Sequence, residues 1–305
     1  MINDRIFDIV SKDKVLFNEP MKKHTSFNIG GPASVMVTVS NEEELADVIR
    51  LANEENIPYF LLGNGSNILV SDEGYRGIVI KLGGDFFDIK TEGNVIKAGA
   101  GVSLSKLAGT AMNASLSGLE FASGIPGTLG GALYMNAGAY GGEMSMVVTK
   151  VRALGFSGNV SNPDVFEFSN AQMQFGYRRS VLKEKKFIAL SCEIELKQSD
   201  KELIAEYMRE LAFKRKEKQP LEYPSAGSTF KRPEGYFAGK LIEDAGLGGY
   251  TIGGAQVSEK HKGFVINRGN ATAKDVKDLI EYVKETVQKQ TGVTLEPEIL
   301  FLGKF

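Results

Sequence analysis

Two glycine-rich stretches contain the residues of this chain whose types and spacing could do chemistry. The longer stretch runs from Gly118 to Gly142; eight of its residues are glycine, and no charged residue lies between Glu120 and Glu143. Glycine costs roughly 0.5–1 kcal/mol relative to alanine inside a helix or strand, so we infer that this backbone lies close against something large. Backbone N–H groups beside apolar side chains suit an extended, anionic, partly apolar cofactor. A buried linker packed on the core is the alternative, and composition alone favours neither.

The shorter stretch, Gly63-Asn64-Gly65-Ser66-Asn67, joins two short apolar segments, 59–62 and 68–70. Its Asn-Gly pair is a strong signal for a β-hairpin turn. The alternative is an anion-binding loop, in which consecutive N–H groups and the Ser and Asn side chains converge on a phosphate. The residues alone favour the hairpin.

Composition limits the partners. The chain has 305 residues, of which 42% are apolar and 24% charged, and its formal net charge of −2 gives no reason to expect nucleic acid or an anionic membrane as a partner. The lone Cys192 excludes an intrachain disulfide. No apolar run approaches the ~18–20 residues of a membrane span, and acidic residues near the N-terminus are not typical of a signal peptide. We therefore expect a cytoplasmic protein without membrane insertion.

Common metal and nucleotide motifs are missing from the sequence. The chain has only two histidines, His24 and His261, and no cysteine pair, which argues against a metal site. It contains no G-x-G-x-x-G after a strand and no phosphate-binding G-x-x-x-x-G-K-[ST] loop. Any nucleotide must be held in a less common way.

The elements that would position these stretches alternate between helices and strands, so we predict an α+β fold. Capping residues place predicted helix starts at Asn41 (with Glu44), Ser103, Ser199 (with Glu202) and Thr272 (with Asp275), and a further short helix is predicted around residues 237–245. Predicted strands are 35–39, 59–62, 68–70, 77–82, 94–98, 147–156, 164–168, 187–196, 263–267 and 295–302. The length indicates two or three lobes, and strands give way to a capped helix near residues 199–200, where we place a boundary.

Five motifs, in this order, resemble those of the UDP-N-acetylenolpyruvoylglucosamine reductases, which act in peptidoglycan precursor synthesis. The motifs are Leu62-Gly-Asn-Gly-Ser-Asn-Ile-Leu69, Gly124-Ile-Pro-Gly-Thr-Leu-Gly-Gly131 with Asn136-Ala-Gly-Ala-Tyr-Gly141, Tyr177-Arg178 with Ser180, Ala226-Gly-Ser-Thr-Phe230 and Leu295-Glu-Pro-Glu298. The resemblance spans essentially the whole chain. Because little sequence separates Ser180 from the helix at Ser199, there is no room for the tyrosine-bearing segment of one subclass, and the chain is similar to the shorter subclass.

The resemblance implies a two-subdomain FAD-binding fold of the vanillyl-alcohol-oxidase type, followed by a C-terminal α+β substrate domain. The implied domains are 1–90 and 91–199 for FAD and 200–305 for the substrate. FAD is held non-covalently, and the glycine-rich stretches gain a role, because a diphosphate in a water-poor cleft needs several donors close to the backbone. The implied FAD-binding residues are Gly63, Asn64, Gly65, Ser66, Asn67, Ser123, Ile125, Pro126, Gly127, Gly131, Asn136, Gly138 and Ala139.

The implied reaction reduces UDP-N-acetylglucosamine enolpyruvate to UDP-N-acetylmuramate. NADPH gives a hydride to FAD, and the reduced flavin gives it to the β-carbon of the enolpyruvyl group. The family pattern then implies that Arg178 stabilises the growing enolate, that Ser228 protonates the α-carbon, and that Glu298 acts with Arg178 on the carboxylate. By sequence alone, Arg179 could take the place of Arg178. Each of the three residues also has an ordinary structural alternative: a surface salt bridge for Arg178, a turn position for Ser228 and an exposed strand position for Glu298.

Substrate contacts are implied for Tyr177, Lys218 and Lys240. Some family members carry Asn where this chain has Arg232, and Gln near His261, so those two positions are left out. We expect a monomer that binds the UDP-sugar and NADPH but no nucleic acid and no metal. The alternatives are another FAD-dependent oxidase or dehydrogenase of the same superfamily, which would consume oxygen, and a non-catalytic UDP-sugar or nucleotide-binding protein, which would be colourless.

Overall fold

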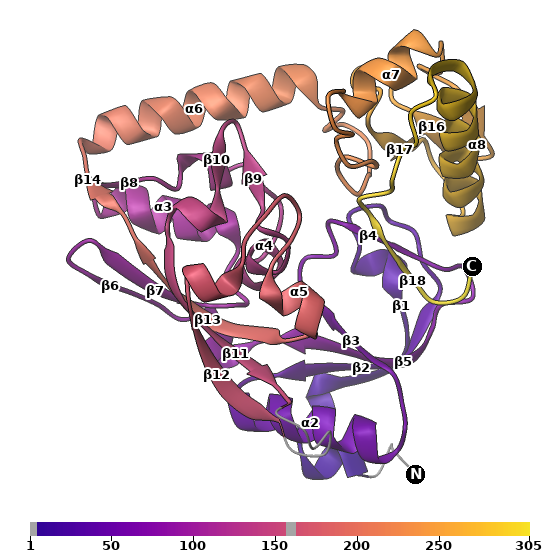
Figure 1. The fold of residues 1–305 in the computed structure, drawn as a ribbon. Helices are drawn as coiled ribbons and strands as arrows, with labels where there is room; N and C mark the ends of the chain where they lie inside the picture. Colours follow the sequence, from indigo (N-terminus) through magenta and orange to yellow (C-terminus); the bar gives the residue numbers. More distant parts are fainter. Residues whose placement is uncertain (1–4, 157–162) are drawn as a thin grey trace. The chain divides into compact units, whose positions relative to one another are not determined.

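A computed structural model describes residues 5–156 and 163–305 of the chain (Figure 1). Residues 1–4, which belong to the acidic N-terminus considered above, lie outside the described ranges. The chain divides into two compact units: unit 1 comprises Met1–Leu16, Met36–Gly63 and Gly77–Arg215, and unit 2 comprises Phe17–Val35, Asn64–Arg76 and Lys216–Phe305. No helix in the described ranges combines the length and apolar character needed to cross a bilayer.

The N-terminal part of the chain forms a four-stranded sheet. Its order is β1 (Val15–Pro20), β2 (Pro32–Val39), β5 (Tyr75–Leu82) and β3 (Tyr59–Leu62), and β3 runs parallel to β5. Helix α2 (Glu42–Glu54) begins as predicted, because the Asn41 side chain accepts a hydrogen bond from the Glu44 N–H at 2.9 Å. One face of α2 is buried, with Leu45, Val48, Ile49 and Ala52 at helical spacing.

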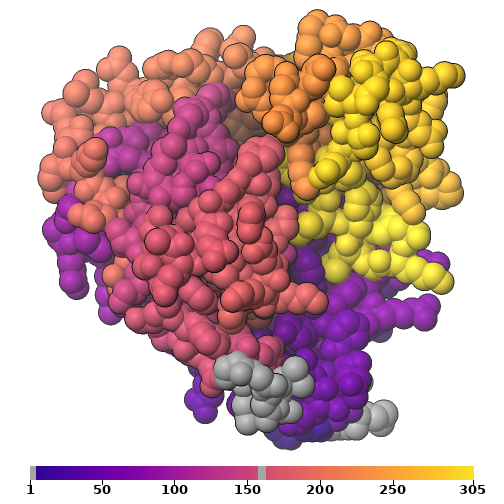
Figure 2. Space-filling model, in the orientation of Figure 1, coloured from indigo at the N-terminus to yellow at the C-terminus, as the bar shows by residue number. Residues whose placement is uncertain are grey.

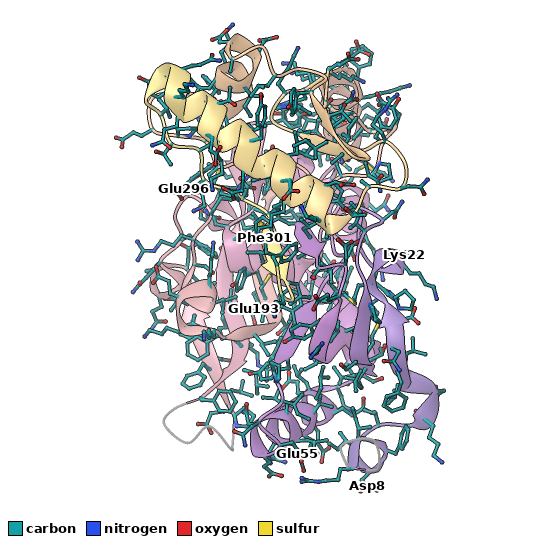
Figure 3. All side chains as sticks on the ribbon, turned by 90° about the vertical axis from the view of Figure 1, so that its right-hand side faces the viewer. Asp8, Lys22, Glu55, Glu193, Glu296 and Phe301 are labelled. Carbon is teal, nitrogen blue, oxygen red and sulfur yellow. The ribbon has the colours of Figure 1, made fainter. Side chains whose placement is uncertain are left out.

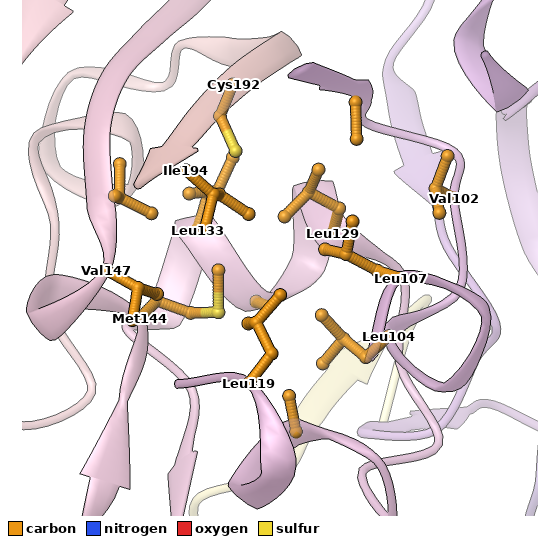
Figure 4. Packing of buried hydrophobic residues seen from close by; sticks show 14 of the residues in the cluster. Val102, Leu104, Leu107, Leu119, Leu129, Leu133, Met144, Val147, Cys192 and Ile194 are labelled. Carbon is orange, nitrogen blue, oxygen red and sulfur yellow. The ribbon is translucent and has the colours of Figure 1, made fainter. Parts of the chain in front are cut away.

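An antiparallel five-stranded sheet forms most of the rest of unit 1. Its order is β12 (Asp164–Ser169), β11 (Val148–Gly155), β13 (Ile188–Glu195), β7 (Val95–Gly99) and β6 (Ile89–Glu92). The helices of this part are α3 (Leu104–Asn113), α4 (Leu129–Met135) and α5 (Val181–Lys185), and short pairs join β8 (Leu116–Ser117) to β14 (Lys197–Gln198) and β9 (Gly138–Ala139) to β10 (Gly142–Glu143). Figure 4 shows Leu107 of α3, Leu129 and Leu133 of α4 and Cys192 of β13 within one apolar core.

The long helix α6 (Lys201–Lys218) starts differently from our prediction. Asp200, not Ser199, accepts the hydrogen bonds at its beginning, from the N–H groups of Glu202 at 2.8 Å and Leu203 at 3.2 Å. Ser199 instead donates its N–H to the Ser115 carbonyl at 2.9 Å. An aspartate caps a helix as well as a serine does, so tertiary pairing of Ser199 decides which residue takes the position.

Unit 2 is built around helix α8 (Ala273–Thr291), which packs beside the three-stranded sheet of β15 (Thr251–Ile252), β16 (Ala255–Val257) and β17 (Val265–Asn267) (Figure 1). The predicted cap is confirmed as a capping box between Thr272 and Asp275, and Gly292 ends the helix with φ +75°. Helix α7 (Ala238–Asp244) completes this apolar core.

The predicted hairpin around residues 63–67 is wrong. Strand β3 pairs with β5, whereas β4 (Ile68–Val70) pairs in parallel with β18 (Leu300–Leu302), so the two segments flanking the loop belong to different sheets. Pairing with a strand more than 200 residues away overrides the local Asn-Gly signal. Figure 2 shows the yellow C-terminal residues, to which β18 belongs, exposed on the face in view.

The compact units do not follow the three domains predicted at 1–90, 91–199 and 200–305. Segments Phe17–Val35 and Asn64–Arg76 cluster with the C-terminal residues, and α6 belongs to unit 1 as far as Arg215. The division into two FAD-binding subdomains and a substrate domain therefore stays a prediction, and the compact units have different limits.

Candidate active site

The 63–67 loop contains two glycines that leave no room for a side chain. A Cβ at Gly63 would lie 2.7 Å from Oγ1 of Thr128, in unit 1. Gly65, in unit 2, has φ +62°, and a Cβ there would lie 2.0 Å from the carbonyl oxygen of His24. Asn64 is exposed and Ser66 half-buried. The two glycines therefore pack closely against other residues of the protein, while Asn64 and Ser66 remain accessible.

The glycines of the 118–142 stretch serve two purposes. Some allow close packing within the protein: a Cβ at Gly142 would lie 2.5 Å from the Phe121 ring, and one at Gly138 would lie 2.7 Å from the Gly142 carbonyl oxygen. Others face open space, because Gly131 is exposed and its Cβ would meet only Thr128, at 3.5 Å. Gly131 nevertheless lies in a helix, α4, which Thr128 caps.

The accessible part of this stretch carries no acidic side chain. Glu120, the acid at its start, is buried and accepts a hydrogen bond from the Gly118 N–H at 2.8 Å. Of the predicted FAD-binding residues between 123 and 127, Ser123, Ile125 and Gly127 are half-buried and Pro126 is exposed. Gly138 and Ala139 form β9 and are half-buried.

Asn136 links the glycine-rich stretch to the segment that carries Arg178. It is 2% exposed, ends α4 in the left-handed conformation (φ 47°), and accepts a hydrogen bond from the Ser145 N–H at 2.9 Å through Oδ1. Its Nδ2 donates to the Gly176 carbonyl at 3.2 Å. The side chain of Asn136 thus bonds to protein on both of its ends, and its predicted contact with FAD stays a prediction.

Arg178 lies in a tight turn with a strained backbone. The N–H groups and carbonyls of Gly176 and Arg179 bond to each other at 3.2 and 3.1 Å, and Arg178 between them has φ +57°. A non-glycine residue in this left-handed region costs about 1–2 kcal/mol, and such strain is concentrated at functional sites. The Arg178 guanidinium lies 5.2 Å from the centre of the exposed Tyr177 ring.

The rival residue Arg179 has the ordinary role that the sequence left open. Its exposed guanidinium pairs with Glu184 of α5. The turn is anchored on both sides, because the buried Ser180 donates to the Tyr134 carbonyl at 2.7 Å and Lys183 Nζ donates to the Arg178 carbonyl at 3.1 Å. The geometry of the turn therefore favours Arg178 over Arg179 as the functional arginine.

Ser228 and Glu298 lie on neighbouring antiparallel segments of unit 2. Phe230 is bridged to Pro297, and the Glu298 N–H donates to the Thr229 carbonyl at 2.8 Å. Thr229 is itself fixed, because its N–H donates to the Gly263 carbonyl at 2.8 Å and its Oγ1 accepts from the Val265 N–H at 2.9 Å. The structure thus places the backbone segments of two of the three predicted catalytic residues side by side, while Arg178 belongs to unit 1.

The predicted substrate-binding lysines are both exposed. Lys218 is the last residue of α6. Lys240 of α7 pairs with Asp244 at 2.6 Å and lies 3.8 Å from Glu243, and the hydrogen bond to Asp244 raises the pKa of Lys240. A salt bridge between residues four apart on a helix is a common surface feature, so nothing in the described residues distinguishes Lys240 as a ligand.

The two positions left out of the prediction have definite surroundings. The Arg232 guanidinium lies 4.0 Å from the centre of the Phe237 ring, and its Nε donates to the Tyr236 carbonyl at 3.3 Å. His261 accepts the Gly263 N–H at Nδ1 at 3.1 Å, and burial lowers its pKa. A ring nitrogen that accepts a hydrogen bond carries no proton, so this contact favours the tautomer protonated at Nε2.

Two candidate residues escaped the sequence reasoning. Thr128 is 8% exposed and lies against both Gly63 and Gly131. Arg215 is half-buried beside Gly124, and burial lowers its pKa. Arg215 lies near the end of α6 between Lys214 and Lys216, and only tertiary packing distinguishes it from these lysine neighbours.

Comparison with known proteins defines the class and then the family. A family model described as an FAD binding domain matches residues 33–162, so the protein is an FAD-dependent oxidoreductase with the predicted α+β fold. A second model, the C-terminal domain of UDP-N-acetylenolpyruvoylglucosamine reductase, matches residues 219–302. The chain belongs to the UDP-N-acetylenolpyruvoylglucosamine reductase family.

Relatives resemble the chain over its whole length. The reductase of this name from Caldanaerobacter subterraneus subsp. tengcongensis is 54% identical over 99% of this chain and 98% of its own length. The reductase from Clostridioides difficile is 52% identical over 98% of this chain and 97% of its own length. The crystal structure of the Thermus caldophilus enzyme is 38% identical, with a TM-score of 0.80, and the match covers 95% of this chain and 98% of that one.

The residues present fit FAD. The 63–67 loop offers accessible Asn64 and Ser66 beside glycines that admit no Cβ, which suits a diphosphate. Between Glu120 and Glu143 the chain has half-buried residues and no charged side chain, which suits an apolar ring. These observations agree with the domain match and leave the individual contacts as predictions.

Proposed function

We propose that this chain catalyses the NADPH-dependent reduction of UDP-N-acetylglucosamine enolpyruvate to UDP-N-acetylmuramate. The names of its full-length relatives and the FAD binding domain match support the reaction class. When bound, FAD accepts a hydride from NADPH and supplies it to the β-carbon of the enolpyruvyl group. The single observation that carries the assignment of residues is the pairing of the Ser228 and Glu298 segments.

Arg178 is proposed to stabilise the negative charge that develops on the substrate. Addition of a hydride at the β-carbon leaves charge on the α-carbon, which spreads into the carboxylate. A guanidinium keeps its charge at every working pH and offers donors in a fixed plane. The anchored, strained turn around Arg178 supports this role, because a preorganised donor stabilises charge without having to move at the moment of reaction.

Ser228 is proposed to donate the proton that the α-carbon receives, with Glu298 acting beside Arg178 on the carboxylate end. Serine is a weak acid, so its proton leaves only toward a strongly basic carbanion or with help from a neighbour. The hydrogen bond between Glu298 N–H and Thr229 O, next to Ser228, supports joint action of the serine and the glutamate.

The remaining assignments follow the family pattern. FAD contacts are proposed for 63–67, for Ser123 and 125–127, and for Gly131, Asn136, Gly138 and Ala139. Tyr177, Lys218 and Lys240 are proposed for the substrate. We further propose that the enzyme is a cytoplasmic monomer, which sedimentation of the FAD-loaded protein would test.

The test separates the two halves of the reaction. Under anaerobic conditions, NADPH should bleach the flavin absorbance of the wild-type protein, and the enolpyruvyl sugar should restore it. Ser228→Ala should be reduced by NADPH at the wild-type rate, but its flavin should be reoxidised by the sugar at least ~100-fold more slowly, as expected for loss of a general acid. Ser225→Ala, in the same segment, is the matched control and should behave as wild type.

Two results would overturn the proposal. Normal reoxidation of Ser228→Ala by the sugar would remove Ser228 from proton transfer. Failure of the wild-type reduced flavin to react with the sugar, together with rapid consumption of oxygen, would instead indicate an oxidase with another substrate.

A further inference from the structure

Asn67 makes two hydrogen bonds to the segment that carries Glu298. Its backbone carbonyl accepts the Leu300 N–H at 3.0 Å, and its side-chain Nδ2 donates to the Glu298 carbonyl at 3.3 Å. All these residues belong to unit 2. Glu296 and Phe301, labelled in Figure 3, lie in the same segment on either side of Glu298. The family motif assigned Asn67 only to the cofactor loop, yet its side chain binds protein main chain.

The peptide groups of Glu298 are consequently held from both directions. Its N–H donates to the Thr229 carbonyl at 2.8 Å, and its carbonyl accepts from Asn67. Immediately after Asn67, strand β4 pairs in register with β18, Ile68 opposite Leu300. The position of the Glu298 backbone therefore depends on the Thr229 segment on one side and on the 63–67 loop on the other.

The Ser228 segment is tied to the same loop through Ser26. The Ser26 N–H donates to the Gly65 carbonyl at 3.1 Å, and its Oγ donates to the Ser225 carbonyl at 2.6 Å. These contacts form a closed ring with the Asn67 bonds. Hydrogen bonds join the loop to Ser225, Thr229 to Glu298 and Glu298 to Asn67, and the chain itself joins Ser225 to Thr229. A closed ring of hydrogen bonds resists displacement of any one member.

We propose that Asn67 is a positioning residue for the reaction of the reduced flavin with the substrate: its side-chain amide fixes the Glu298 peptide, so that the loop predicted to hold the FAD diphosphate also aligns the Glu298 segment with the neighbouring Ser228 segment. The inference rests on the proposed function of Glu298. Without the Asn67 amide, the Glu298 carbonyl loses its donor and the carboxyl group can shift. A misplacement of about 1 Å near reacting groups can cost ~100-fold in rate, and the surviving Thr229 and Leu300 bonds limit the loss to about tenfold.

The test compares Asn67→Ala with Ser71→Ala in protein saturated with FAD. Ser71 is a matched control, because it is buried and its Oγ donates to the Lys304 carbonyl at 2.6 Å, so its loss loosens the same C-terminal segment beyond β18. Asn67→Ala should be reduced by NADPH normally and reoxidised by the enolpyruvyl sugar about tenfold more slowly. Ser71→Ala should match wild type in both steps.

Amide hydrogen exchange supplies a readout that does not depend on turnover. Asn67→Ala should accelerate exchange of the Glu298 and Leu300 N–H groups both with FAD and without it, because the lost contact is within the protein. Ser71→Ala should leave the Glu298 N–H unchanged. Acceleration only in the FAD-loaded form would reassign Asn67 to cofactor binding and overturn the inference.

A double variant distinguishes failure of this inference from failure of the proposed function. If Asn67 acts through Glu298, adding Asn67→Ala to Glu298→Gln should slow reoxidation by less than twofold. A full tenfold additional loss would show that Asn67 acts by another route. If Glu298→Gln alone is reoxidised at the wild-type rate, the catalytic role of Glu298 is wrong, whatever Asn67 does.

Discussion

Replacing Arg178 with glycine should give a more stable protein than replacing it with alanine, while both changes should slow reoxidation of the flavin by the enolpyruvyl sugar by ~100–1,000-fold. Arg178 has φ +57° between two reciprocal backbone hydrogen bonds of the 176–179 turn. An L-residue in this conformation carries about 1–2 kcal/mol of strain, which glycine does not. Glycine in turn costs about 0.5–1 kcal/mol in unfolded-chain entropy. At the middle of both ranges, the expected difference in the free energy of unfolding is about 0.75 kcal/mol in favour of Arg178→Gly.

The alanine variant isolates the backbone contribution. Both substitutions remove the guanidinium 5.2 Å from the Tyr177 ring, an exposed contact worth about 0.5–1 kcal/mol, and both keep the carbonyl that accepts Lys183 Nζ. Denaturant unfolding of the two FAD-saturated variants should give equal slopes and a higher midpoint for glycine. In the anaerobic assay, NADPH should reduce both normally, and reoxidation by the enolpyruvyl sugar should slow by ~100–1,000-fold, the usual effect of removing a charge-stabilising donor.

Two results would refute this reasoning separately. A glycine variant no more stable than the alanine variant would mean that the left-handed backbone at position 178 is not strained. Reoxidation of Arg178→Ala at the wild-type rate would mean that the guanidinium does not stabilise the developing charge, and Arg179→Ala, which breaks only the surface pair with Glu184, would then become the variant to measure.

Two further predictions concern the cofactor loop and helix α8. Gly65→Ala should lose FAD and more than ~2 kcal/mol of stability, since its Cβ would lie 2.0 Å from the His24 carbonyl oxygen. Gly93→Ala is the control, because Gly93 has φ +60° but a Cβ there would meet no atom within 4 Å, and this variant should retain its flavin. Burial raises the pKa of Asp275, but hydrogen bonds from the N–H groups of Thr272 and Gly254 outweigh it and hold that pKa below its ordinary value. The stabilisation of the fold by the ionised Asp275 is present above the unfolded-state pKa and is lost as pH falls through the folded-state pKa. Asp275→Asn should therefore lower the free energy of unfolding at pH 7 by about 0.5–1 kcal/mol. It should also make that free energy less dependent on pH below about pH 4. An unchanged dependence in urea titrations would contradict that assignment.

Local signals predicted the parts of this fold that depend on neighbouring residues. The caps at Asn41, Ser103 and Thr272 bond to N–H groups three residues later, and each was predicted because capping is decided within one turn. The prediction failed where distant chain competes for the same groups. Ser199 pairs with Ser115 and leaves the cap to Asp200, and β4 pairs with β18 instead of forming a hairpin with β3.

Glycine content was the least reliable local signal, because glycine occurs for several reasons: close packing, a positive φ angle, or a place in a helix. In the 118–142 stretch, Gly142 admits the Phe121 ring, Gly141 has φ +87°, and Gly131 lies in the first turn of α4. Sequence reasoning sees only that side chains are missing. The sequence does not tell whether the space beside a glycine is filled by protein: a Cβ at Gly142 would meet the Phe121 ring, whereas one at Gly141 would meet no atom within 4 Å.

The sequence predicts the candidate site as a set of residues but not as an arrangement. Nothing in the sequence around Ser228 or Glu298 indicates that the two segments pair, because the Phe230–Pro297 bridge is a single antiparallel contact between irregular segments almost 70 residues apart. That bridge sets Thr229 opposite Glu298, and a shift of one residue would turn the Glu298 side chain to the other face. Asn67 bonds the carbonyl of that same residue, so the register is held from a third segment. A site assembled from such single contacts depends on backbone hydrogen bonds more than on the identity of its neighbours, which is why substitutions at Asn67 and Gly65 should disturb chemistry that neither residue performs.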